Sequence, residues 1–150
     1  MEEALAKRIP QVSGNYDLDK SVGISARVCR SGIHPLMIGL SATFDDAFQK
    51  QNKKGAYDCV LQDGEGHMVG CKFQTLQYCT SVALVKALGL RGALQLAKKK
   101  RIPKVIIEGD AKTIMDMVNG LQTTAQEVAT VIGDILELST SFVNRLYFCS

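Results

Sequence analysis

The stretch of sequence that decides the fold spans residues 81–110 and reads SVALVKALGLRGALQLAKKKRIPKVIIEGD. Apolar residues recur in its first part at spacings of three and four, which predicts an amphipathic helix with one buried stripe. The stripe comprises Ala83, Ala87, Leu90, Leu94 and Ala97. Ser81 is a suitable N-cap. The basic residues 98–101 (KKKR) suit the negative end of the helix dipole, and Pro103 ends the helix.

A short apolar strand follows this helix. Residues 105–107 (VII) are typical of a central strand that is covered on both faces. Downstream, the sequence predicts a helix over residues 111–118 that stops at Asn119-Gly120, an amphipathic helix over 126–138 and a last strand over 143–148.

Three strands are predicted upstream of the helix. The first covers residues 36–44 and ends at Asp45-Asp46, and the next two, 56–61 and 68–73, flank a D-G-E-G turn typical of a hairpin. The order β-β-β-α-β-α-α-β predicts an α/β fold with a mixed, five-stranded sheet. In it, an antiparallel meander of three strands leads into parallel strands, with helices on the faces of the sheet.

The chain is expected to form one domain over residues 37–150, preceded by an irregular lead-in over 1–36. Gly and Pro interrupt the lead-in repeatedly, and only residues 2–8 favour a short helix there. With 46% hydrophobic and 22% charged residues, the chain can bury a core. No apolar run approaches the roughly 20 residues that span a bilayer, and the N-terminus is unlike a secretory signal. We therefore expect an intracellular protein, cytoplasmic or nuclear, without a membrane partner.

The five cysteines and two histidines give little support to a metal site. No C-x-x-C pair occurs, so reduced and buried thiols are expected, with a facing pair of Cys59 and Cys71 across the hairpin as the alternative. His34 lies in the lead-in and His67 in the hairpin turn, and both are interpreted as solvated.

Two acidic residues follow predicted strands. Asp45 comes after the first strand and Asp110 after the short buried one. Groups at the ends of strands in an α/β sheet can converge on one crevice, and two carboxylates there would make half of a Mg²⁺ site. The alternative is that both are solvated turn residues or helix caps.

Four motifs in order resemble a known family. They are TFDDAF at residues 43–48, GAYDCVLQDGEG at 55–66, LVKALGLRGALQLA at 84–97 and VIIEGD at 105–110. Together they resemble the ribonuclease H-like domain of the retroelement-related plant type, within the RNase H type-1 or reverse transcriptase-like family. The resemblance implies hydrolysis of the RNA strand of RNA–DNA hybrids by two Mg²⁺ ions that four acidic residues hold.

The resemblance assigns the first carboxylate to Asp45 and the third to Asp110, but it places Lys86 where the family has a helix glutamate. This reversal removes a metal ligand and brings a cation to the site, where one unit charge at 4 Å is worth about 4 kcal/mol near a surface. The resemblance places the fourth carboxylate after the last strand, in a segment that is absent here, so we expect a truncated or drifting copy. Without the family pattern, Lys86 would be a lysine that snorkels at the edge of the apolar stripe.

The net charge of +3 is compatible with nucleic acid but does not require it. Candidate contacts to phosphates are Lys53, Lys54, Lys86, Lys99, Lys100 and Arg101; the alternative is that these basic runs are merely solvated. Three functions stay open. They are a Mg²⁺-dependent hybrid ribonuclease, a non-catalytic module that binds an RNA–DNA hybrid or RNA, and a protein-interaction domain without activity, the last two being pseudoenzymes.

Overall fold

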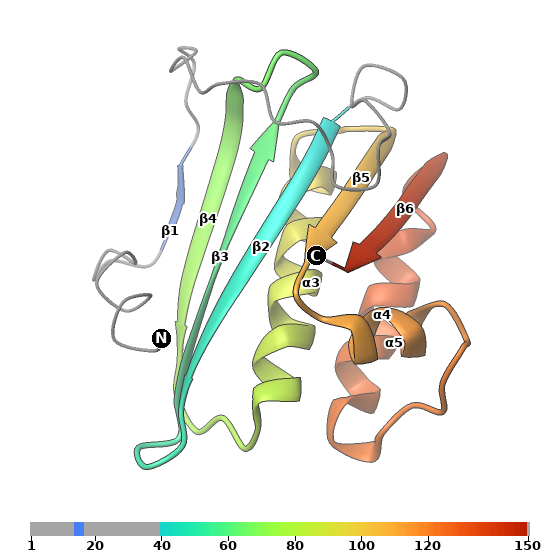
Figure 1. The fold of residues 1–150 in the computed structure, drawn as a ribbon. Coiled ribbons are helices and arrows are strands. Elements are labelled where there is room, and N and C mark those ends of the chain that lie inside the picture. The colour runs from blue at the N-terminus through green and yellow to red at the C-terminus, as the bar shows by residue number, and fades with distance from the viewer. Residues whose placement is uncertain (1–13, 17–39, 150) are drawn as a thin grey trace.

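The computed structural model describes residues 14–16 and 40–149 of the chain (Figure 1). The strands are β1 (Gly14–Tyr16), β2 (Leu40–Gln49), β3 (Lys54–Gln62), β4 (Met68–Leu76), β5 (Lys104–Gly109) and β6 (Asn144–Cys149). The helices are α3 (Val82–Lys99), α4 (Lys112–Val118) and α5 (Ala129–Ser139), the last preceded by the 3-10 turn η1 (Gln126–Val128).

The strands form one mixed sheet in the order β1-β4-β3-β2-β5-β6. β2, β3 and β4 make an antiparallel meander, while β5 is parallel to β2 and β6 is parallel to β5. The predicted α/β class and mixed sheet are thus confirmed. The sheet gains a sixth strand, β1, which pairs with β4. Its three residues are too few to show an alternating pattern, and they fall in the predicted lead-in. The helix expected over residues 2–8 and His34 lie outside the described residues.

The first strand of the meander extends further at its C-terminal end than predicted, while residues 36–39 of the prediction lie outside the described residues. β2 continues through both aspartates to Gln49, because it pairs with β3 residue by residue from Ser41 opposite Gln62 to Gln49 opposite Lys54. The expected strand end at residue 44 was therefore wrong. Successive side chains of a strand point to opposite faces, so Asp45 and Asp46 lie on different faces of the sheet.

Helix α3 lies along one face of the sheet, with α5 beside it (Figure 1). The predicted N-cap is confirmed, because Ser81 Oγ accepts a hydrogen bond from the Leu84 N–H at 3.2 Å. The buried surface is wider than the predicted stripe, since α3 packs against both the sheet and α5. A Cβ at Gly92 would lie 2.5 Å from Tyr57 Cε2, so this glycine permits the close approach of helix and sheet.

Cys59, Cys71 and Cys79 are free thiols, as expected, although Cys71 is only partly buried. Cys59 pairs with Lys72, and Cys71 pairs with the neighbouring Val60. The two cysteines therefore point to opposite faces of the sheet, and a facing pair was the wrong alternative. The buried Cys59 Sγ donates to Gly89 O at 3.5 Å, and burial raises the pKa of its thiol.

Within the described residues, no helix has the length and apolar character that crossing a membrane requires.

Candidate functional site

A lysine and two carboxylates meet near the end of β2. Lys86 Nζ lies 3.8 Å from Asp46 Oδ1 and 3.5 Å from Asp110 Oδ2. The same ammonium donates a hydrogen bond to the backbone oxygen of Asp110 at 2.5 Å. The three residues come from β2, from the second turn of α3 and from the connection between β5 and α4. We call these three residues the Lys86 cluster.

The topology of the sheet explains why these residues converge. β2 and β5 are parallel neighbours, with Phe44 opposite Gly109. The residues that follow Phe44 and Gly109 therefore lie toward the same end of the sheet. A Cβ at Gly109 would overlap the ring of Phe44, which is itself 5% exposed. Glycine at this position therefore lets β5 stay against β2 and deliver Asp110 beside Asp46.

The two carboxylates of the cluster differ in environment. The Asp46 side chain is 12% exposed, whereas that of Asp110 is 77% exposed. Burial raises the pKa of Asp46 to about 6; Lys86 acts in the opposite direction, and the charges of Asp45 and Asp110 raise it further. The positive charge of Lys86 therefore offsets part, but not all, of the free energy that burying the Asp46 carboxylate costs.

The structure gathers only part of the predicted site. It brings Lys86 and Asp110 together, but the β2 carboxylate that joins them is Asp46. Asp45 lies on the opposite face, where it is directly across from Asp58 of β3. Its Oδ1 accepts a hydrogen bond from the Asp46 N–H at 2.9 Å. The sequence signal for Asp46 was its alternation with Phe44 and Phe48, which pack on the α3 face.

The Lys86 cluster does not have the ligands for a two-metal site. The cluster contains two carboxylates, those of Asp46 and Asp110, and the Lys86 ammonium lies within 4 Å of an oxygen of each. Among residues 14–16 and 40–149, no three His, Cys, Asp or Glu side chains are grouped so that they could hold a metal ion. Mg²⁺ needs oxygen ligands and an accessible negative charge, so the residues present here do not fit it.

The predicted basic residues lie at two separate places. Lys53 lies in the turn after β2 and Lys54 begins β3, at the end of the sheet where α3 begins (Figure 1). Lys99, Lys100 and Arg101 lie where α3 ends. The 18 residues of α3 separate the two groups by about 27 Å along the helix axis. The structure therefore does not make one continuous surface of them.

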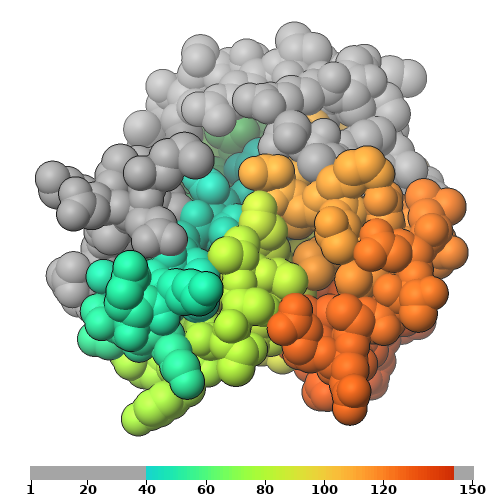
Figure 2. All heavy atoms as spheres, turned by 60° about the horizontal axis from the view of Figure 1, so that its bottom comes forward, coloured from blue at the N-terminus to red at the C-terminus, as the bar shows by residue number. Residues whose placement is uncertain are grey.

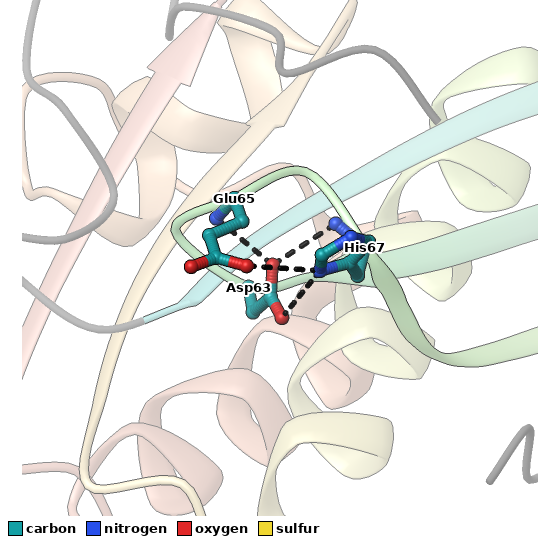
Figure 3. A network of polar contacts seen from close by, with 3 residues as sticks. All are labelled: Asp63, Glu65 and His67. Atoms are coloured by element: carbon teal, nitrogen blue, oxygen red, sulfur yellow. Dashed lines mark hydrogen bonds and ion pairs between the residues drawn. The ribbon is translucent and has the colours of Figure 1, made fainter. Parts of the chain in front are cut away.

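The hairpin turn after β3 contains a compact polar network (Figure 3). His67 Nδ1 lies 3.4 Å from Asp63 Oδ2 and 3.4 Å from Glu65 Oε2, and its side chain is 33% exposed. Asp63 Oδ1 accepts from the N–H groups of Glu65 and His67, both at 2.9 Å. Desolvation opposes these contacts only in part, so the pKa of Asp63 is lowered. The interpretation of His67 as simply solvated was wrong, because the D-G-E-G turn folds back on it.

Comparison with known families and proteins gives one family match. The profile of the family described as reverse transcriptase-like matches residues 43–146, which contain the whole Lys86 cluster. Among curated proteins, none has significant sequence similarity to the chain.

Solved structures support the fold. RNase H1 from the halophilic archaeon Halobacterium salinarum superposes with a TM-score of 0.68 at 21% identity, covering 74% of this chain and 84% of that protein. The N-terminal RNase H domain of a Mycobacterium tuberculosis protein gives 0.69 at 14% identity, over 75% and 82%. LC11-RNase H1 in complex with an RNA/DNA hybrid gives 0.66 at 12% identity, over 74% and 84%. The fold of this chain is therefore RNase H-like.

Proposed function

The chain belongs to the reverse transcriptase-like family, and from that premise we propose that it is a nucleic-acid-binding RNase H-like domain whose hydrolytic activity is weak or lost. The observation that carries the proposal is the position of Lys86, whose ammonium contacts both Asp46 and Asp110. The finer prediction of a plant retroelement type stays a prediction.

The reasoning for lost hydrolysis is electrostatic. The activity that the resemblance implies requires Mg²⁺ ions, which activate water and stabilise the leaving oxygen. In this chain the Lys86 ammonium supplies fixed positive charge at the carboxylates. A unit charge within 4 Å repels an arriving cation by about 4 kcal/mol for each charge of the ion near a surface. Asp46 and Asp110 attract the ion, but Lys86 offsets about one of these two charges and lies beside both carboxylates, so we propose that Mg²⁺ binds weakly or not at all.

The reasoning for nucleic-acid binding starts from shape and charge. One structural neighbour was solved with an RNA/DNA hybrid bound. Hybrid and RNA duplexes are recognised by shape, by phosphates and by 2′-hydroxyl groups, none of which requires a metal. Lys53, Lys54 and Lys86 lie toward the same end of α3, and we propose that they contact phosphates there. We assign Lys99, Lys100 and Arg101 to a second contact, which a duplex reaches only if it lies along α3.

The first test measures metal binding and cleavage together. The native chain, Lys86→Glu and Asp110→Asn are incubated with a labelled RNA–DNA hybrid in Mg²⁺ or Mn²⁺, and the melting temperature is recorded with and without each ion. We expect the native chain to bind the hybrid, to leave it uncut and to show no ion-dependent melting shift. Lys86→Glu should gain such a shift, because it restores a carboxylate. Metal-dependent cleavage by the native chain that Asp110→Asn abolishes would overturn the proposal.

The second test separates the two groups of basic residues. A double charge reversal, Lys53→Glu with Lys54→Glu, is compared with Lys99→Glu plus Lys100→Glu, which changes the net charge equally. Each lost phosphate contact should flatten the dependence of log affinity on log salt by about 0.7–0.9. We expect the first pair to weaken hybrid binding about tenfold or more at low salt, and the second pair to weaken it less. Equal effects would show that the binding responds only to net charge.

A further inference from the structure

Two segments far apart in the sequence form one edge at the start of α3. They are the turn at residues 50–53, after β2, and residues 77–81, before α3. The Cys79 N–H donates a hydrogen bond to the backbone oxygen of Lys53 at 2.8 Å, which joins the segments. They lie side by side at the lower end of the sheet in Figure 1, and Figure 2 shows that face from below. We call this edge the Tyr78 edge.

Tyr78 is an unusual residue within that edge. Its side chain is 86% exposed, the largest value among the exposed large hydrophobic residues that the structure describes. Its φ of +60° lies in the left-handed region, which a bulky aromatic residue rarely adopts. Lys53, across the hydrogen bond, has a φ of +50°. Such conformations persist only where the surrounding structure enforces them, and they concentrate at functional sites.

The neighbour of Tyr78 provides that enforcement. Cys79 is 2% exposed and packs in a small apolar cluster with Phe48 of β2 and Val85 of α3. Cys79 is therefore anchored in the protein, whereas Tyr78, the residue before it, is exposed to solvent. The ring of Tyr78 is held away from the core on a fixed backbone, so binding a ligand on it would require little ordering of the loop.

The charge around the ring is positive. Lys53 is exposed in the adjoining turn, and Lys54 is exposed at the start of β3. The first turn of α3 has no acidic residue, so the positive end of its dipole is not neutralised by its own side chains. Residues 77–85 carry no charged side chain at all. An exposed aromatic ring next to cations is the arrangement that holds single-stranded nucleic acid, with the base on the ring and the phosphates on the cations.

We propose that Tyr78 stacks an unpaired nucleobase, and that Lys53 and Lys54 hold the phosphates beside it. The ligand is single-stranded nucleic acid, either free or as the overhang of a hybrid. A protein partner is less suited to the edge, because Val82, the other large hydrophobic residue exposed near it, is only 43% exposed. The inference deepens the proposed function, on which it rests for the class of ligand, and it adds a preference for unpaired bases.

The experiment uses the absence of tryptophan from the chain. Tyr78→Trp introduces a single indole, whose fluorescence reports directly on stacking. It is titrated with a blunt RNA–DNA hybrid, with the same hybrid carrying a single-stranded overhang, and with the single strand alone. We expect quenching by the last two and little by the blunt hybrid. We also expect the native chain to bind the overhang hybrid about tenfold more tightly than the blunt one.

Two further variants separate stacking from folding. Tyr78→Phe keeps the ring and should keep the overhang preference. Tyr78→Asn removes the ring but tolerates the left-handed backbone better, so it should raise the melting temperature while the overhang preference disappears. A merely structural tyrosine would instead leave the preference unchanged in Tyr78→Asn.

The outcomes distinguish this inference from the proposed function. If the blunt hybrid binds but the overhang adds no affinity and no quenching, the stacking role is overturned and the proposed function stands. If only single-stranded ligands bind and quench, the stacking role is supported and recognition of the hybrid fails. If no nucleic acid binds, both are overturned.

Discussion

The two ends of α3 both carry lysines, but the surroundings of those lysines differ. Near the first end, Lys86 contacts Asp46 and Asp110 from two other elements. At the other end, Lys98, Lys99 and Arg101 are exposed in a run where the helix stops. One end thus has a cation held by tertiary contacts, and the other has cations at a helix terminus, where they favour the dipole.

This difference shows that a single lysine can tell more about a functional site than a conspicuous run of basic residues does. The run is conspicuous in the sequence, yet its local role at the helix end is sufficient to explain it. The single Lys86 stands in an apolar helix, and only its partners reveal what it does. Three measurements can break or sharpen the contrast between the two ends.

The largest effect is expected from Gly109→Ala. The added Cβ would overlap the ring of Phe44 in the core, so we expect a loss of about 3 kcal/mol in the free energy of unfolding. Asp110 should be displaced with it. The control is Gly133→Ala in α5, where a Cβ meets nothing within 4 Å and where stability should rise by about 0.5–1 kcal/mol. Urea unfolding of both variants decides the matter, and equal losses would contradict the tight packing inferred at the site.

A smaller effect is expected from the pH dependence of Asp46. Its folded pKa of about 6 lies above its ordinary value of 3.8. The folded state therefore favours the neutral form of Asp46. The stability that this preference contributes is fully present below the ordinary pKa and is lost as the pH rises through about 6. Compared with Asp46→Asn, the native chain should lose about 2 kcal/mol between pH 4 and pH 7. Parallel stability curves for the two proteins over this range would refute the assignment.

The smallest effect is expected from neutralising one lysine at each end of α3. Lys86→Met keeps the stem but removes the charge that compensates Asp46, so it should destabilise the protein by about 1 kcal/mol at pH 7. It should also raise the pKa of Asp46 further. Lys99→Met, a matched change at the exposed end, should stay within about 0.5 kcal/mol. Thermal unfolding of both variants gives the comparison. A larger loss of stability in Lys99→Met than in Lys86→Met would contradict the inferred difference between the two ends of α3.

Much of the fold was predictable because it rests on local signals. Alternation, the D-G-E-G turn, the Ser81 cap and Pro103 gave the strands of the meander and the extent of α3. The length of β2 was not predictable in this way, because its end depends on pairing with β3. β1 was missed because three residues carry no period, and their place in the sheet depends on a pairing with β4.

The candidate site was predictable in composition and only partly in geometry. The family pattern identified Lys86 and Asp110, which the structure brings into contact. It assigned the β2 carboxylate to Asp45, whereas Asp46 is the one that contacts Lys86. A shift of one residue along a strand moves a side chain to the other face. Motif alignment alone could not decide that shift.

The sequence by itself determined the order of the elements after β1, the family and the replacement of an expected carboxylate by Lys86, because each depends on residue identity and spacing along the chain. Only the tertiary structure decided which aspartate meets Lys86, how far apart the basic groups lie and that Tyr78 stands exposed on a left-handed backbone. These depend on the register between strands and on the packing of α3 against the sheet. Such contacts join residues that are distant in the sequence. Alternation with Phe44 and Phe48 places Asp46 on one face of the sheet, but no local pattern pairs it with Lys86.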